Sequence, residues 1–530
     1  MANKNFMKDV KDVMVVDPDA KYNVSVTENG ALGYATTGSK FVDAMFDLPN
    51  LRTTLADHIK MIWKDLYAED KNLAVLFMFY VGDIRGGAGE RFIFRNMFKA
   101  FCEADPRRAE YFIKYIPDYS RWDIMFDLFG IDKYVDAAIV NNVRIQFYQD
   151  IAIVTEKKNE PISLLAKWLP SYNTSSIETK KKAAIVAKEC FGLDIVHNPS
   201  DQRTYRKMIS TVRKALKLTE TAMSSNNWSE IEYSAVPSKA HVKYTKAFMK
   251  HDEERYNEYI HKVEIGEEKI NASTLYPCDI VYKYLNSQIG HWMSSDINFD
   301  PILEEMWKAL PSYDFGDRDI LSVIDGSGSM RGHIGGSNMS ALAVGFALGI
   351  YFAEHSHGAF RNTFMTFSHD PHIIKFGEND TLADKLERLL VEDDCSNTNI
   401  ERVFELVLDT AVKNGYTQED LPGTISIVSD MEFDKAQSYA NGSTDARLFN
   451  EIAKRYEEAG YKLPKLVFWN VNSRTSTIPV RENDLGVTLV SGYSVHILKM
   501  VLNGKLDPFE AIKDVLMSDR YAPIMQQLGM

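Results

Sequence analysis

Cysteine is scarce in this chain of 530 residues. There are only four, namely Cys102, Cys190, Cys278 and Cys395. None of them lies at the short spacing of a redox or zinc pair, which argues against a disulfide framework and against a cysteine metal site. We therefore expect reduced thiols in a cytoplasmic protein.

Long apolar runs are also lacking. The longest, 341–353, is shorter than the roughly 20 residues that a membrane-spanning helix needs. The first residues, Met1–Phe6, lack the apolar core of a signal peptide. The sequence thus predicts no membrane role.

An overall excess of positive charge is missing too, because the net charge is −13. The acidity belongs to residues 301–530, with 21 basic against 33 acidic side chains, whereas residues 1–300 hold 40 against 41. Within the first part, residues 151–250 carry 17 basic and 9 acidic side chains and form a candidate anion-binding surface. Its prominent cations are Lys180, Lys181, Lys182, Arg203, Arg206, Lys207, Arg213, Lys214 and Lys217.

The length favours at least two domains, and the first 300 residues show mostly helical periodicity. Helices are predicted at 56–67, 73–81, 91–102, 108–116, 135–154, 162–169, 179–190, 204–218 and 240–262. Many helices of medium length joined by short turns are typical of a helical-repeat array. The Gly-rich segment 86–89 lacks the Lys-Ser/Thr pair of a phosphate-binding loop, so we predict a connection between helices. Arg121 and Asp123 are expected to form a structural ion pair.

The most informative stretch, 325–330, reads Asp-Gly-Ser-Gly-Ser-Met and follows the apolar strand predicted at 319–324. Its carboxylate and two hydroxyls, from Asp325, Ser327 and Ser329, would lie at the carboxyl edge of a sheet, where open α/β folds bind ligands. Oxygen ligands favour Mg²⁺ or Mn²⁺ over zinc. The alternative is that these glycines and serines only form a tight turn after the strand and bind no metal.

Two further polar groups follow in the order that would complete such a site. Thr398 precedes a predicted helix at 400–412, and Asp430 ends the predicted strand 424–430. Together with the first loop, this order resembles the metal-ion-dependent adhesion site (MIDAS) of von Willebrand factor A domains, over roughly residues 317–504. The resemblance implies that Asp325, Ser327, Ser329, Thr398 and Asp430 hold the cation and leave one position for an acidic partner.

The N-terminal half is similar to the TROVE-like family, which includes the Ro autoantigen and many uncharacterised bacterial and phage relatives. The motifs lie at 28–34, 81–91 and 116–123, and the chain resembles the uncharacterised relatives more than Ro. The resemblance implies a ring of HEAT-like helical repeats joined to a doubly wound von Willebrand A (Rossmann-like) domain. The expected organisation is an N-terminal extension (1–25), a helical-repeat domain (26–310) and an A-like domain with C-terminal helices (317–530).

Family membership of this kind implies a non-enzymatic RNA-binding or ribonucleoprotein scaffold for structured or single-stranded RNA. The nine cations above would contact phosphates, and Tyr205 could stack on a base. Basic residues at helical spacing more often form only a solvated face. Two alternatives therefore stay open, a protein-interaction adaptor without RNA and, less favoured, a metal-dependent phosphoester hydrolase.

Overall fold

The computed structural model describes residues 23, 25–30, 32–272, 274–287, 297–312, 319–335, 337–367, 371–392, 400–433, 448–479, 487–493, 497 and 507–530. It divides into two compact units, each made of two separate stretches of chain. Unit 1 comprises residues 1–53 and 276–515, and unit 2 comprises residues 54–275 and 516–530. Residues 26–53, which we expected to begin the helical domain, thus lie in unit 1.

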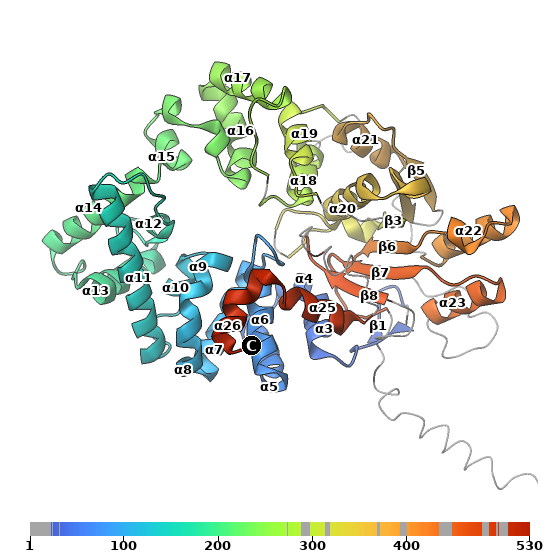
Figure 1. Cartoon of the computed structure of the whole chain (residues 1–530), viewed down its shortest axis with the longest axis horizontal. Helices are drawn as coiled ribbons and strands as arrows, with labels where there is room; N and C mark the ends of the chain where they lie inside the picture. Colours follow the sequence, from blue (N-terminus) through green and yellow to red (C-terminus); the bar gives the residue numbers. More distant parts are fainter. Residues whose placement is uncertain are drawn as a thin grey trace, which may run out of the picture. The chain divides into compact units, whose positions relative to one another are not determined.

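Unit 1 is built on a six-stranded sheet with the order β5-β4-β3-β6-β7-β8 (Figure 1). Its strands are β3 (Ile320–Asp325), β4 (Thr363–Phe367), β5 (His372–Lys375), β6 (Thr424–Ser429), β7 (Lys465–Asn470) and β8 (Val487–Ser491). All neighbouring strands are parallel except β4 and β5. The chain leaves β3 toward β4 and returns on the other side at β6, so the strand order reverses between β3 and β6.

The predicted strands at 319–324 and 424–430 are confirmed as β3 and β6. Every residue of β3 and β4 is buried, which requires that both faces of the central sheet are covered. This explains why these strands read as continuous apolar runs rather than as alternating patterns.

The helices of unit 1 flank this sheet. They are α3 (Lys40–Phe46), α4 (Leu48–Leu51), α18 (Pro277–Ser287), α19 (Pro301–Lys308), α20 (Ala341–His355), α21 (Leu382–Glu392), α22 (Ile400–Asn414), α23 (Leu448–Glu458) and α25 (Pro508–Leu516). The apolar run 341–353 is the buried body of α20, which packs on β3, β4 and β6. A Cβ at Gly349 would lie 2.2 Å from the Phe364 ring, so only glycine permits this close approach. In the described part of the chain, no helix combines the length and apolarity required to cross a bilayer.

An N-terminal segment completes unit 1. The two-residue strands β1 (Ser25–Val26) and β2 (Leu32–Gly33) pair antiparallel, and Tyr34 then bridges to Ile478. Helix α3 contacts β8, and Asn470 Nδ2 at the end of β7 donates to the carbonyl of Phe46 at 2.8 Å.

Unit 2 is helical throughout its described residues. Its α-helices are α5 (Ala56–Glu69), α6 (Lys71–Gly82), α7 (Arg91–Ala104), α8 (Pro106–Ala109), α9 (Ile116–Tyr119), α10 (Asp123–Phe126), α11 (Lys133–Thr155), α12 (Leu165–Trp168), α13 (Ile177–Phe191), α14 (Pro199–Ala215), α15 (Thr219–Ser224), α16 (Ser238–His251), α17 (Glu253–Glu264) and α26 (Ala522–Leu528). Most of the predicted helices are confirmed to within a few residues. The single helix predicted at 240–262 is wrong, because Asp252, with φ −150° and ψ 45°, breaks it into α16 and α17.

The C-terminal stretch of unit 2 packs against α6 and α9. The carboxylate of Asp83 is fully buried and accepts from Arg520 Nε at 2.8 Å and Nη2 at 2.9 Å. Tyr521 stacks on Tyr119, with ring centroids 5.6 Å apart. The Gly-rich segment is confirmed as a connection between α6 and α7, and a Cβ at Gly87 would meet the Tyr80 carbonyl at 2.1 Å. The predicted pair of Arg121 and Asp123 is confirmed, with Nε and Oδ1 2.8 Å apart.

Candidate functional site

The loop after β3 places Asp325 and two serines at the carboxyl edge of the sheet. Ser327 N donates to Asp325 Oδ1 at 2.9 Å, and Ser429 Oγ donates to Asp325 Oδ2 at 2.6 Å. The hydroxyls of Ser327 and Ser329 share a hydrogen bond of 2.9 Å. A carboxylate with no exposed surface is therefore fixed beside two hydroxyl groups.

The loop after β6 brings Asp430 to the same place, since β3 and β6 are neighbours. Asp430 also has no exposed surface, and Ser329 hydrogen bonds to its side chain. The next residue, Met431, adopts a φ of 63°, a left-handed conformation that is uncommon for non-glycine residues. The structure thus joins four of the five predicted metal-site residues.

The two carboxylates are electrostatically frustrated. Burial, followed by the neighbouring charge of Asp430, raises the pKa of Asp325 to about 7. Burial also raises the pKa of Asp430, although the Ser329 hydrogen bond and the Arg474 guanidinium oppose that shift. A bound cation would relieve this repulsion, because it would favour the charged form of both groups.

The available oxygens fit a hard divalent cation. Oδ2 of Asp430 is buried and accepts no hydrogen bond from the described residues, and the cation that pairs with it is the Arg474 guanidinium. Two carboxylates and two hydroxyls form the oxygen-rich set that Mg²⁺ and Mn²⁺ prefer. In the described ranges there is no cluster of three or more His, Cys, Asp or Glu side chains suited to a metal. The candidate site contains two carboxylates and two hydroxyls and is therefore not a cluster of that kind. Thr398 lies outside the described residues.

One cation of the protein already reaches this site. Arg474 Nη2 lies 3.4 Å from Asp430 Oδ2 and 2.7 Å from an oxygen of Glu28. The Arg474 side chain is 36% exposed, so it has room to turn toward solvent. A guanidinium at this position offsets part of the charge of Asp430.

A third buried carboxylate, Glu432, holds the surrounding loops in place. Its Oε1 accepts from the backbone nitrogens of Arg474 at 2.7 Å and Thr475 at 3.0 Å, and its Oε2 accepts from Glu28 N at 2.8 Å. The sequence analysis missed both Glu432 and Arg474. Glu432 lies two residues after Asp430, which was a usable signal, but nothing local to Arg474 indicates its position.

The nine predicted RNA-contacting cations divide into two groups. Seven are solvent-exposed: Lys180 and Lys181 on α13, Arg203, Arg206, Lys207 and Lys214 on α14, and Lys217 in the turn after α14. The other two make internal contacts. Lys182 pairs with Asp127 and, at 2.7 Å, with Glu178, while Arg213 Nε donates to the Ala166 carbonyl at 2.7 Å.

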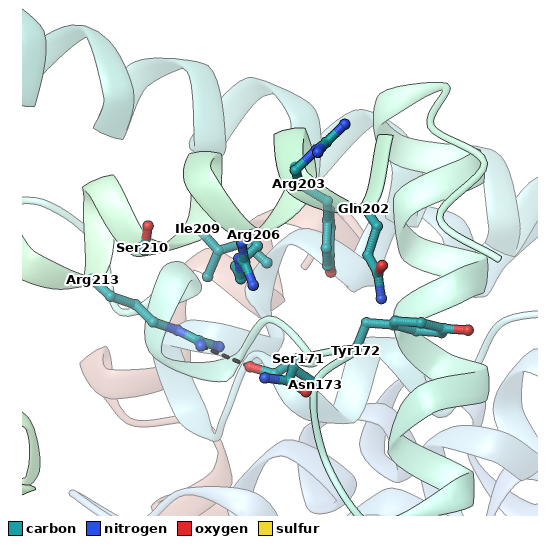
Figure 2. A pocket seen from close by; sticks show the side chains of 10 residues that line it. Ser171, Tyr172, Asn173, Gln202, Arg203, Arg206, Ile209, Ser210 and Arg213 are labelled. Carbon is teal, nitrogen blue, oxygen red and sulfur yellow. Dashed lines mark hydrogen bonds between the residues drawn. The ribbon is translucent and has the colours of Figure 1, made fainter. Parts of the chain in front are cut away.

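The expected role of Tyr205 in stacking on a base is wrong. Its side chain is only 2% exposed, and its hydroxyl donates to the Pro170 carbonyl at 3.0 Å. The helical position between Arg203 and Arg206 faces the core of α13 and α14 rather than solvent. Tyr205 forms part of the inner wall of a pocket of about 350 Å³ beside α14 (Figure 2).

Comparison with known proteins finds two family models, both described only as domains of unknown function. DUF2828 matches residues 143–311, which include α13 and α14, and DUF7788 matches residues 319–521, which include the sheet and all five candidate metal residues. Neither description names a TROVE domain or a von Willebrand A domain.

An uncharacterised relative and a solved structure are also similar to this chain. The uncharacterized protein L728 of Acanthamoeba polyphaga mimivirus is 27% identical over 533 residues, covering 93% of this chain and 87% of that protein. The crystal structure of the Deinococcus radiodurans RO (RSR) protein shares 14% identity, covers 86% of this chain and 94% of that chain, and gives a TM-score of 0.44. A TM-score below 0.5 is too low to establish a shared fold.

Proposed function

We propose that this protein is a non-enzymatic RNA-binding scaffold whose sheet unit carries a divalent cation site of the MIDAS type. The observation that carries the metal part is the pair of buried carboxylates, Asp325 and Asp430, at the β3–β6 switch point, where Asp430 Oδ2 accepts no hydrogen bond from the described residues. In this proposal the A-like domain is unit 1, and the HEAT-like array is unit 2.

Within the proposed site, Asp325, Ser327, Ser329 and Asp430 hold Mg²⁺ or Mn²⁺, with Thr398 as the fifth ligand. The cation would supply a Lewis-acidic position for an acidic group of a partner. Glu432 keeps the loops of the site in register, and Ser429 orients Asp325 through its 2.6 Å hydrogen bond. In this proposal the hydroxyls of Ser327 and Ser329 are ligands and the hydroxyl of Ser429 orients Asp325, so we propose recognition rather than hydrolysis.

The metal proposal is tested by thermal unfolding with and without Mg²⁺ or Mn²⁺. We expect both ions to stabilise the wild type, and Asp325→Asn to abolish the effect. Glu378→Gln, which alters an exposed carboxylate outside the site, serves as the control and should respond like the wild type. Equal stabilisation of the Asp325→Asn variant would contradict the site.

The RNA proposal rests on the exposed cations of α13 and α14 and on the resemblance of the N-terminal motifs. Reversing Lys180, Lys181, Lys207 and Lys214 to Glu should weaken the binding of mixed RNA and reduce its salt dependence by about one phosphate contact per side chain involved. Lys182 and Arg213 are left intact because they stabilise the fold. Unchanged affinity would mean that these lysines only solvate the helices.

A second candidate, a protein-interaction adaptor without RNA, is favoured by one observation. Two of the nine predicted phosphate contacts are committed to internal hydrogen bonds and ion pairs, which lowers the free positive charge of the surface. The adaptor would show no salt-sensitive shift with RNA but would still bind an acidic protein ligand through the metal site. The same RNA titration therefore separates the two candidates.

A further inference from the structure

A pocket of about 350 Å³ lies between α14 and the segment that connects α12 to α13 (Figure 2). Its volume is in the lower part of the range of small-molecule sites, which is roughly 300–1,000 Å³. The polar side chains that could contact a ligand are Ser171, Tyr172, Asn173, Gln202, Arg203 and Arg206.

The wall opposite α14 is held in a fixed position. Arg213 donates to the carbonyl of Leu169 at 2.5 Å and to Ser171 Oγ at 2.8 Å, as the dashed line in Figure 2 shows. Tyr205 anchors the same segment through the Pro170 carbonyl. These contacts fix the backbone from 169 to 171 before any ligand arrives, which lowers the entropic cost of binding.

Two guanidinium groups of the pocket carry uncompensated charge. Arg203 and Arg206 are exposed, and neither forms an ion pair with any residue that the structure describes. Arg206 hangs toward the 171–173 segment in Figure 2, whereas Arg203 extends outward from α14. The nearby carboxylate of Asp201 is used locally, since it accepts from Asp194 N at 3.0 Å.

The remaining lining residues are mostly polar and supply hydrogen-bond donors and acceptors. Asn173 and Gln202 line the pocket with amide side chains and Ile209 with an apolar one, while the Tyr172 hydroxyl points away from them in Figure 2. Arginine binds phosphate oxygens through paired N–H donors, and amide side chains pair with the edges of nucleobases. The volume exceeds what a phosphate ion alone would fill.

We propose that this pocket binds one phosphorylated nucleotide, with its phosphate at Arg206 and its base against Asn173, Gln202 and the ring of Tyr172. The nucleotide is either a free mononucleotide or the phosphorylated terminal residue of an RNA strand. The second case rests on the proposed RNA-binding function and deepens it, because it gives the protein a preference for phosphorylated ends.

The experiment measures binding of the full chain to a fluorescent 12-nucleotide RNA carrying a 5′-phosphate, a 3′-phosphate or hydroxyls at both ends. One of the phosphorylated strands should bind about tenfold or more tightly than the hydroxyl strand, since charge-assisted hydrogen bonds to one phosphate account for that factor. Arg206→Gln should remove most of the preference. Lys188→Gln, an exposed lysine of α13 outside the pocket, is the matched control and should keep it.

Competition with AMP separates the two sources of the nucleotide. Displacement of the strand by AMP, lost in Arg206→Gln, means that the pocket accepts a free nucleotide; a phosphate preference without AMP competition means that it reads strand ends. Equal binding of all three strands, with no AMP binding, overturns the pocket proposal while leaving salt-dependent RNA binding intact. AMP binding that depends on Arg206, without any RNA binding, overturns the scaffold proposal and keeps the pocket.

Discussion

Asp325→Asn should stabilise the metal-free protein even though it destroys the proposed metal site. The folded protein holds the proton of Asp325 at a pKa of about 7, against an ordinary value near 3.8. Because the folded state binds this proton more tightly than the unfolded chain, the stability of the wild type falls as the pH rises from about 4 to about 7. At about 1.4 kcal/mol per pKa unit, the ionised carboxylate costs about 4 kcal/mol at pH 8.

Asparagine removes that cost but also removes one acceptor. The bond from Ser429 Oγ to Asp325 Oδ2, 2.6 Å long, is weakened or reversed, at about 1.5 kcal/mol. The expected net gain is thus about 2–3 kcal/mol at pH 8, or a rise in melting temperature of about 3–5 °C for a unit of this size. Near pH 5 the wild-type carboxyl is largely protonated, and the gain should vanish.

The assay is thermal unfolding in EDTA at pH 5 and pH 8, followed by far-UV circular dichroism. Glu378→Gln is the control, and its melting temperature should stay within about 2 °C of the wild type, because surface substitutions usually change stability by less than about 0.5 kcal/mol. A loss of stability in Asp325→Asn at pH 8, or an equal gain at both pH values, would refute the inference that burial and the charge of Asp430 raise the pKa of Asp325.

Three further predictions concern charged groups elsewhere. Arg520→Gln should lower the unfolding free energy of unit 2 by about 3 kcal/mol, since it leaves Asp83 buried without its counter-charge. The loss is measured as faster hydrogen exchange of the amides of residues 71–82, and unchanged protection of these amides would contradict the prediction. Burial lowers the pKa of His241 to about 4, so the folded protein binds this proton less tightly than the unfolded chain, and the unfolding free energy should fall by up to about 3 kcal/mol as the pH falls from about 6.5 to 4. His241→Gln should remove this pH dependence of the unfolding free energy, measured by urea unfolding over that range. Arg474→Gln should tighten Mn²⁺ binding about fivefold in an EPR titration, because it removes a cation 3.4 Å from Asp430; weaker binding would show that the arginine assists the metal.

The sequence predicted those features that depend on local pattern. The runs 320–324 and 424–429 are apolar because parallel strands are covered on both faces, and the helices of unit 2 show the 3.6-residue period of one buried side. The order of Asp325 and Asp430 along the chain was enough to bring them together, because the carboxyl ends of neighbouring parallel strands meet at one edge.

Features that depend on distant partners could not be predicted in this way. The break at Asp252 carries no glycine or proline, and Tyr205 occupies a helical position whose burial is decided by the connection before α13. Arg474 and Asp430 come from different loops, and the partner of Asp83 lies 437 residues further along the chain. Such pairs leave no periodic signal in the sequence.

Each unit is assembled from two stretches of chain that are far apart in synthesis, and this imposes an order on the maturation of the protein. The ribosome synthesises α5 to α17 more than 200 residues before Arg520 and Tyr521. Until then the nascent helical unit lacks the arginine that neutralises the buried carboxylate of Asp83. Helix α3 likewise lacks its packing partner until β8 has been synthesised. Neither unit can be obtained by a single cut, and a fragment ending between 276 and 515 would carry two unfinished bodies rather than one complete domain.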